Sequence, residues 1–140
     1  MIILDTNVIS EFMRDVPDPA AVLWMNRQPR PSIWTSSINV FEIRSGLLAM
    51  PAGKRRTARI LAFEYLLNET IQGRIAVFDL AAAHNASDLD AEGQKKGWPR
   101  EARDTMIAGI VLASHATLAT RNVKHFEDIA ASVVNPWEKS

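Results

Sequence analysis

The chain opens with the stretch MIILDTN at positions 1–7, a short apolar run that ends abruptly at an acidic residue. Residues 2–4 are β-formers, and a run of this kind predicts a buried strand. Asp5 directly follows the strand, so we expect its side chain at the carboxyl edge of a sheet. Open α/β sheets bind their ligands at that edge. The stretch therefore predicts both the first strand and the location of a functional site.

The rest of the chain alternates short β-rich runs with segments whose apolar residues recur every three or four positions. This alternation is typical of a mainly parallel sheet with helices on both faces. We expect five short strands, at residues 2–4, 33–35, 75–78, 118–120 and 133–134. Helix-ending residues lie between them, at Pro51 with Gly53, Gly73 and Gly97 to Pro99, and Pro136 closes the fold after the last strand. The predicted fold class is α/β, with a single domain over residues 1–140.

Composition narrows the possible functions. A chain of 140 residues that is 47% hydrophobic suits one domain with an ordinary core. The absence of cysteine excludes disulfides, thiolate zinc sites and a thiol nucleophile. No apolar run approaches the roughly 18–20 residues of a membrane span, and no basic leader precedes the first strand. We therefore expect a cytoplasmic protein without a membrane partner.

The 16 basic and 16 acidic residues balance, so any affinity for a nucleic acid must be local. Basic residues form three clusters, at Lys54, Arg55, Arg56 and Arg59, at Lys95, Lys96, Arg100 and Arg103, and at Arg121 and Lys124. The first two clusters are typical of solvated helix faces. The third is of more interest, because it lies next to the predicted site.

Four polar residues are predicted to meet at one edge of the sheet. Asp5 follows the first strand, Glu42 lies early in the helix after the second, Asp104 opens the helix before the fourth, and Asn122 follows the fourth. Carboxylates gathered in a cleft repel one another, and oxygen ligands suit Mg²⁺ or Mn²⁺. The arrangement predicts a metal site.

Each of these residues also has a purely structural interpretation. Asp5 could cap the following helix. Asn39 and Glu42 have the spacing of a capping box, in which the Glu42 side chain bonds back to the Asn39 amide. Asp104 in a first helical turn favours the helix dipole, and Asn122 is a common turn residue.

Taken together, these motifs resemble those of the PIN-domain family, and in particular of VapC-type toxins. The matching segments are ILDTNVISE at 3–11, DTMIAG at 104–109, TRN at 120–122, Phe126 and VNPW at 134–137. The closing motif and the chain length are most similar to the FitB-like branch. The resemblance covers essentially the whole chain and is least specific over residues 54–97.

The resemblance implies a Mg²⁺- or Mn²⁺-dependent endoribonuclease, the toxin of a type II toxin–antitoxin pair. Asp5, Glu42 and Asp104 match the three acidic metal-site positions of the family. Asn122 stands where many relatives carry a fourth acid, and an amide offers an oxygen but no negative charge. We therefore expect one bound ion in the resting state.

Neighbouring residues are expected to assist the acids. Thr6 and Thr120 are placed to hydrogen-bond the carboxylates and orient them. Arg121 and Lys124 are candidates for binding the phosphates of the substrate. In such a site the ion would activate water for in-line attack on a phosphodiester.

Partners are also implied by the resemblance. They are a cognate antitoxin whose C-terminal segment lies across the site, operator DNA bound only through that antitoxin, and a second copy in a homodimer with a basic groove. The segment at residues 54–71 carries a broad apolar stripe of Ala58, Leu61, Ala62, Tyr65 and Leu66. This stripe indicates either an interface or additional core.

Three other functions remain open from the sequence. The chain could act mainly as a weakly catalytic partner in an antitoxin complex that binds operator DNA. It could be a phosphotransferase with Asp5 as nucleophile, although such enzymes carry a second Asp where this chain has Asn7. It could also be a structural domain whose acids only cap helices.

Overall fold

The computed structural model describes residues 1–138 and contains one sheet of five parallel strands. The strands are β1 (Ile2–Leu4), β2 (Ile33–Ser36), β3 (Ile75–Ala76), β4 (Thr117–Ala119) and β5 (Val133–Val134). They are ordered β3-β2-β1-β4-β5, and every neighbouring pair is parallel. The predicted five-stranded α/β fold is confirmed.

The bounds of three strands differ from the sequence prediction. β2 extends to Ser36, while β3 stops at Ala76 instead of Phe78. β3 is an edge strand, and the Phe78 amide donates to the Ser37 hydroxyl at 3.2 Å rather than to a neighbouring strand. β4 ends at Ala119, one residue before the predicted end. These shifts leave the strand positions as predicted and move only their ends.

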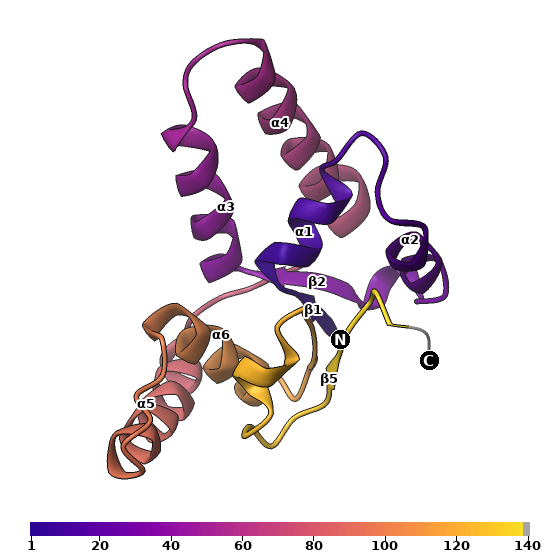
Figure 1. Ribbon diagram of the computed structural model, residues 1–140. Coiled ribbons are helices and arrows are strands. Elements are labelled where there is room, and N and C mark those ends of the chain that lie inside the picture. Colours follow the sequence, from indigo (N-terminus) through magenta and orange to yellow (C-terminus); the bar gives the residue numbers. More distant parts are fainter. Residues whose placement is uncertain (139–140) are drawn as a thin grey trace.

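Six α-helices surround the sheet, namely α1 (Thr6–Phe12), α2 (Pro19–Asn26), α3 (Ser37–Ala49), α4 (Lys54–Tyr65), α5 (Leu80–Lys95) and α6 (Ala102–Ala113). Shorter helical turns are η1 (Arg30–Ser32), η2 (Leu66–Ile71), which continues α4 with π-helical geometry, and η3 (Val123–Phe126). In Figure 1, α3 and α4 lie on one side of the sheet, and α5 and α6 lie on the other.

Alternation along the strands divides the core into two parts. Ile3 and Leu118 face one side of the sheet, where they pack with residues of α5 and α6. Leu4 and Ala119 face the other side, where they pack with residues of α1, α3 and α4. All four are fully buried. The sheet is thus covered on both faces, which explains its almost uniformly apolar strands.

The strand order creates a crevice at the carboxyl ends of β1 and β4. The chain passes from β1 to β2 and β3 on one side, and then returns to place β4 on the other side of β1. At such a reversal the loops after the two central strands diverge and leave room for a ligand. Asp5 follows β1 and Thr120 follows β4, so both residues lie at this crevice.

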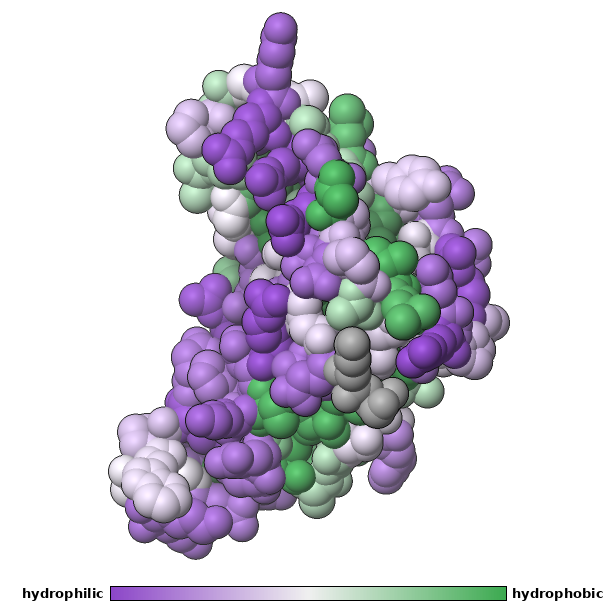
Figure 2. Space-filling model, turned by 45° about the vertical axis from the view of Figure 1, so that its right-hand side comes forward, coloured by the Kyte–Doolittle hydropathy of each residue, from purple (hydrophilic) through white to green (hydrophobic). Residues whose placement is uncertain are grey.

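The surface is mixed in polarity. Figure 2 shows a face that is mainly hydrophilic, with hydrophobic residues gathered in patches near its centre. Within residues 1–138, no helix has both the length and the apolar character that crossing a membrane requires.

Close packing of α5 against α6 depends on Gly109, which is buried in α6. A Cβ atom at this position would lie 2.8 Å from the Ala86 Cβ atom and would overlap the Ala82 carbonyl oxygen. Gly46 in α3 offers a contrast, because a Cβ atom there would meet no atom within 4 Å. A side chain would therefore clash at position 109 but not at position 46.

We predict that Gly109→Ala lowers the free energy of unfolding by about 1–3 kcal/mol, the usual cost of overpacking a core. Gly46→Ala is the matched control and should raise stability by up to about 1 kcal/mol, because alanine is the better helix former. Urea denaturation of both variants measures the two effects. Equal stabilities of wild type and Gly109→Ala would contradict the close helix packing.

Candidate active site

A hollow of about 720 Å³ lies at the carboxyl ends of β1 and β4. It brings together the four residues selected from the sequence, Asp5, Glu42, Asp104 and Asn122. The other residues that line it are Thr6, Asn7, Ser10, Glu11, Arg14, Arg59 and Arg121. Five separate parts of the chain therefore contribute to a single polar site.

The Asp5 carboxylate is held by three hydrogen bonds. Its Oδ1 atom accepts from the Thr6 amide at 2.8 Å and from the Asn39 side chain at 3.0 Å. Its Oδ2 atom accepts from the Thr120 hydroxyl at 2.8 Å. The Thr6 bond caps α1, so the capping interpretation of Asp5 holds together with its place in the site. Oδ2 still has one lone pair to offer.

Asn39 does not cap α3, and the capping-box interpretation of Asn39 and Glu42 is wrong. Ser36 caps this helix by accepting from the Asn39 amide, because β2 runs one residue further than predicted. The Asn39 side chain is fully buried and donates to Asp5 and to the Thr6 hydroxyl oxygen. Its position three residues before Glu42, and thus on the same helix face, was the signal for this role.

Glu42 is joined to the same network through Thr6. The Thr6 hydroxyl donates to the Glu42 Oε1 atom at 2.9 Å, and the Arg103 guanidinium lies 3.9 Å from Oε2. Desolvation raises the pKa of Glu42, and the negative charges of Asp5 and Asp104 raise it further. The fold thus holds Glu42 where its ionised form is disfavoured.

Asp104 lies in the first turn of α6, where the Glu101 side chain caps the helix by accepting from the Asp104 amide. The His125 Nδ1 atom is 3.2 Å from the Asp104 Oδ2 atom. Burial raises the pKa of Asp104, and Asp5 and Glu101 raise it further by repulsion. Asp104 and Glu42 are therefore both disfavoured as anions by their surroundings.

Thr120 connects the β4 loop to the site. Its hydroxyl donates to Asp5 and accepts from the Asn122 amide at 3.0 Å and the Asn7 side chain at 3.3 Å. The Asn7 side chain also accepts from the Arg121 amide at 3.0 Å. These hydrogen bonds hold the start of α1 and the loop after β4 together. The sequence analysis did not predict this contact of Asn7 with Thr120 and Arg121.

The two predicted phosphate-binding residues lie in different places. Arg121 lines the acidic hollow, and its guanidinium lies over the Trp137 ring at 4.0 Å from the centroid. Lys124 lines a neighbouring hollow instead, together with Asp104 and His125. Arg59 and Arg103 were predicted only to belong to solvated basic clusters. Arg59 in fact lines the acidic hollow, and the Arg103 guanidinium lies 3.9 Å from Glu42.

The donor set of this hollow fits a hard divalent cation in its chemistry. Carboxylate oxygens of Asp5, Glu42 and Asp104 line one space, and their mutual repulsion would be relieved by a positive charge. Over residues 1–138, no three His, Cys, Asp or Glu side chains are already gathered tightly enough to hold an ion. Glu42 and Asp104 are 22% and 26% exposed, so both side chains have room to approach Asp5.

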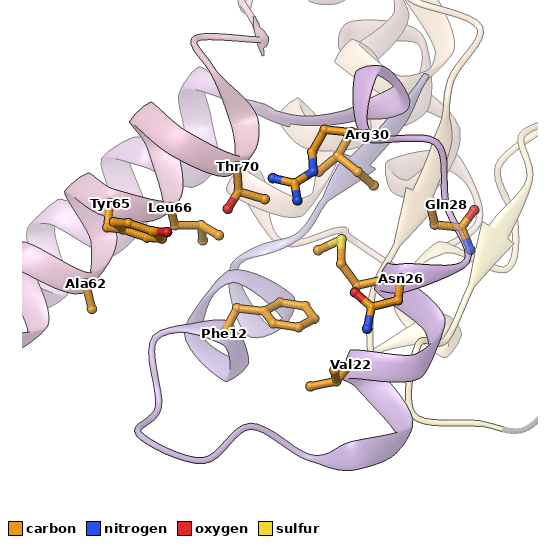
Figure 3. Close-up of a pocket in the computed structure, with 11 residues that line it drawn as sticks. Phe12, Val22, Asn26, Gln28, Arg30, Ala62, Tyr65, Leu66 and Thr70 are labelled. Atoms are coloured by element: carbon orange, nitrogen blue, oxygen red, sulfur yellow. The ribbon is translucent and has the colours of Figure 1, made fainter.

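A second hollow, of about 340 Å³, is separate from the acids. Figure 3 shows it between α1, α2 and the α4–η2 helix, with Phe12, Val22 and Leu66 around it. No acidic residue lines it. The apolar stripe predicted over residues 54–71 is therefore partly core and partly surface, because Leu66 is buried while Tyr65 is 67% exposed.

Comparisons with known proteins found relatives that match nearly the whole chain. The model of the PIN domain family matches residues 2–132. The chain is 40% identical to the VapC ribonuclease Y4jK of Sinorhizobium fredii and 31% identical to Toxin FitB of Neisseria gonorrhoeae, covering 99% of each of these proteins and 99% and 98% of this chain. It also resembles a chain in the structure of FitAB bound to the IR36 DNA fragment, with a TM-score of 0.89 and 31% identity over 100% of this chain and 98% of that one.

We predict that Asp104→Asn raises the midpoint of thermal unfolding at pH 7 in metal-free buffer. The raised pKa means that the fold binds a proton at Asp104 more tightly than the unfolded chain, so ionised Asp104 destabilises the fold above its usual pKa of 3.8. The gain should shrink as the pH falls toward and below 3.8, where both states are protonated. Asp88→Asn, an exposed change on α5, is the control and should leave the midpoint unchanged.

We also predict that Asn39→Asp destabilises the protein at pH 7 by more than Asn39→Ala does. Alanine removes buried hydrogen bonds at a cost of about 1–3 kcal/mol, whereas aspartate adds a charge beside the Asp5 carboxylate. Denaturant unfolding of both variants measures the order. Asn68→Asp, at an exposed position, controls for added charge. The reverse order would show that Asn39 does not face Asp5 as a donor.

Proposed function

The chain belongs to the PIN-domain family, and from this membership we propose that it is a metal-dependent endoribonuclease, the toxin of a toxin–antitoxin pair. One observation carries the proposal. Asp5, Glu42 and Asp104 line a single hollow in which burial and mutual repulsion raise the pKa of two of the three carboxyl groups. A protein maintains such a cluster against its own stability where function requires it.

Asp5 and Asp104 would hold a Mg²⁺ or Mn²⁺ ion, with Glu42 bound directly or through water. Such an ion, when bound, polarises a phosphodiester oxygen and lowers the pKa of water for in-line attack. The hydrogen bonds from Asn39 and Thr120 keep the Asp5 carboxylate in one orientation. That orientation reduces the rearrangement needed when substrate arrives.

Arg121 is the candidate for binding a substrate phosphate in the acidic hollow. Its guanidinium is stacked on Trp137, which orients the group without neutralising its charge. Lys124, in the neighbouring hollow, would contact a phosphate further along the strand. The two cations would thus follow a nucleic-acid backbone past the acids.

Asn122 makes this site less acidic than one with four carboxylates. The Asn122 backbone amide donates to the Thr120 hydroxyl, and this bond holds the residue beside the hollow. The side-chain carbonyl offers an oxygen ligand without charge. We expect one ion in the resting state for this reason.

The proposed partner is a small antitoxin. Support comes from the neighbouring structure, which is described as FitAB bound to a DNA fragment. Operator DNA would accordingly be bound only through the antitoxin, and a homodimer would present two acidic hollows. The hollow beside Phe12 and Tyr65, which is lined by both apolar and polar side chains, is a candidate site for side chains of the antitoxin.

A second candidate function is regulatory, in which the chain cleaves RNA feebly and acts mainly within an antitoxin complex on operator DNA. The observation in its favour is Asn122, which removes one negative charge from the position where many relatives carry an acid. A phosphotransferase with Asp5 as nucleophile is disfavoured, because Asp5 already accepts three hydrogen bonds and Asn7 is engaged by Thr120 and Arg121.

We predict that antitoxin-free protein cleaves RNA from a mixed cellular pool only when Mg²⁺ or Mn²⁺ is present. Asp104→Asn should lower the rate by more than about 100-fold, since changing even an outer partner of a metal site costs about 10- to 100-fold. Gel analysis of the RNA with and without metal measures both effects. Equal inactivity of folded wild type and variant would favour the regulatory function.

We further predict that Asn122→Asp lowers the concentration of Mn²⁺ needed for half-maximal cleavage. The substitution adds a carboxylate beside Asp5, Glu42 and Asp104 and so increases the attraction of the site for a divalent cation. Titration of the metal at fixed RNA concentration measures the change, with Asp88→Asn as an exposed control on α5. An unchanged requirement for metal would show that position 122 does not contribute to the ion site.

A further inference from the structure

A hollow of about 380 Å³ adjoins the acidic site, and Asp104 lines both. Its walls come from the loop between α5 and α6 and from η3, including Trp98, Arg100 and Lys124. None of the proposed metal-binding groups except Asp104 belongs to it. A strand of nucleic acid that crosses the acids would therefore extend into this second space.

Trp98 presents a large aromatic surface at the edge of this hollow. It is 78% exposed, although an indole is among the most favourable side chains to bury. The loop that carries it is packed firmly on α5, because the Trp98 amide donates to the Gly93 carbonyl at 2.9 Å. A Cβ atom on Gly93 would lie 2.9 Å from the Trp98 carbonyl oxygen. The exposed ring is thus attached to a fixed backbone.

Arg100 lines the same hollow and carries one unsatisfied donor. Its side chain is 8% exposed and forms an ion pair with Asp128. Among the residues that the structure describes, the buried Nε atom of Arg100 has no hydrogen-bond partner. An unsatisfied buried donor is costly, so the packing around the Arg100 guanidinium is incomplete as it stands.

We propose that this hollow binds one nucleotide of a single-stranded RNA beside the cleaved phosphate, with its base stacked on Trp98. The inference rests on the ribonuclease function proposed above. An aromatic platform next to Lys124 and Arg100 has the chemistry of single-strand recognition.

The charges of the hollow agree with a stacked base more than with an anion alone. Acidic side chains lining it outnumber the basic ones, and they are Glu101, Asp104, Glu127 and Asp128. Asp128 is paired with Arg100, and Glu101 is bonded to the Asp104 amide. Stacking must therefore supply most of the affinity, and Lys124 would guide one phosphate.

The test measures binding of a fluorescein-labelled single-stranded RNA oligonucleotide by anisotropy, with metal chelated so that no cleavage occurs. Trp98→Ala should weaken binding by about 5- to 150-fold, the range for loss of one base–aromatic stack. Trp98→Phe should retain most of the affinity. Leu23→Ala, at a residue that is 53% exposed on α2, is the control and should bind as wild type does.

A second measurement does not depend on the variant remaining folded. Oligonucleotides with one abasic position each are bound to the wild-type protein, and loss of the base at one position should weaken binding by about 5- to 150-fold. The variant should show no additional loss with that oligonucleotide, because the stacked pair is already broken.

Equal affinities of wild type and Trp98→Ala for every oligonucleotide would overturn the proposal. A change of oligomeric state in Trp98→Ala would also overturn it, by assigning the ring to a contact between copies. Binding that depends on Trp98 without cleavage in any metal would refute the ribonuclease and leave the nucleotide site. Cleavage by wild type together with unaltered RNA binding by Trp98→Ala would refute the nucleotide site and leave the ribonuclease.

Discussion

The rest of the site depends on how the Asp5 carboxylate is held. Three donors fix it, from the Thr6 amide on α1, the Asn39 side chain on α3 and the Thr120 hydroxyl after β4. These donors lie on elements far apart in sequence, and only the parallel order of β2, β1 and β4 brings them to one point. A shift of any one strand by a residue would remove a donor and leave a buried charge unsatisfied. The geometry of the site therefore depends on the register of the sheet.

Asp5 differs from Glu42 and Asp104 in its energetics. It is 5% exposed but accepts three hydrogen bonds, which compensate for its lost hydration. Glu42 and Asp104 have fewer donors, and repulsion adds to burial in raising the pKa of each. This arrangement combines one rigid carboxylate with two that are poised to accept a positive charge. The acidic cluster lies in a partly open hollow because complete burial would make the repulsion between the carboxylates prohibitive.

Much of this fold was predictable because its signals are local. Short apolar runs marked all five strands, and the acid after β1 marked the edge where the site lies. The ends of β2 and β4 were less predictable, because they depend on pairing with other strands. The contact between Asn39 and Asp5 was not predicted for the same reason, since the two residues are 34 positions apart in sequence. His125 and Arg103 were missed because their contacts with Asp104 and Glu42 follow from tertiary packing, which residue spacing does not encode.

The measurement that tests the central claim most directly is the thermal midpoint of the purified chain as Mn²⁺ is added. An ion bound only by the folded state stabilises it, by about 2.7 kcal/mol at 100 times its dissociation constant. We predict that wild type gains stability with Mn²⁺ and that a variant with both Glu42→Gln and Asp104→Asn does not. A folded wild type whose midpoint stays constant to high Mn²⁺ concentration, or a variant that gains as much as wild type, would contradict this prediction.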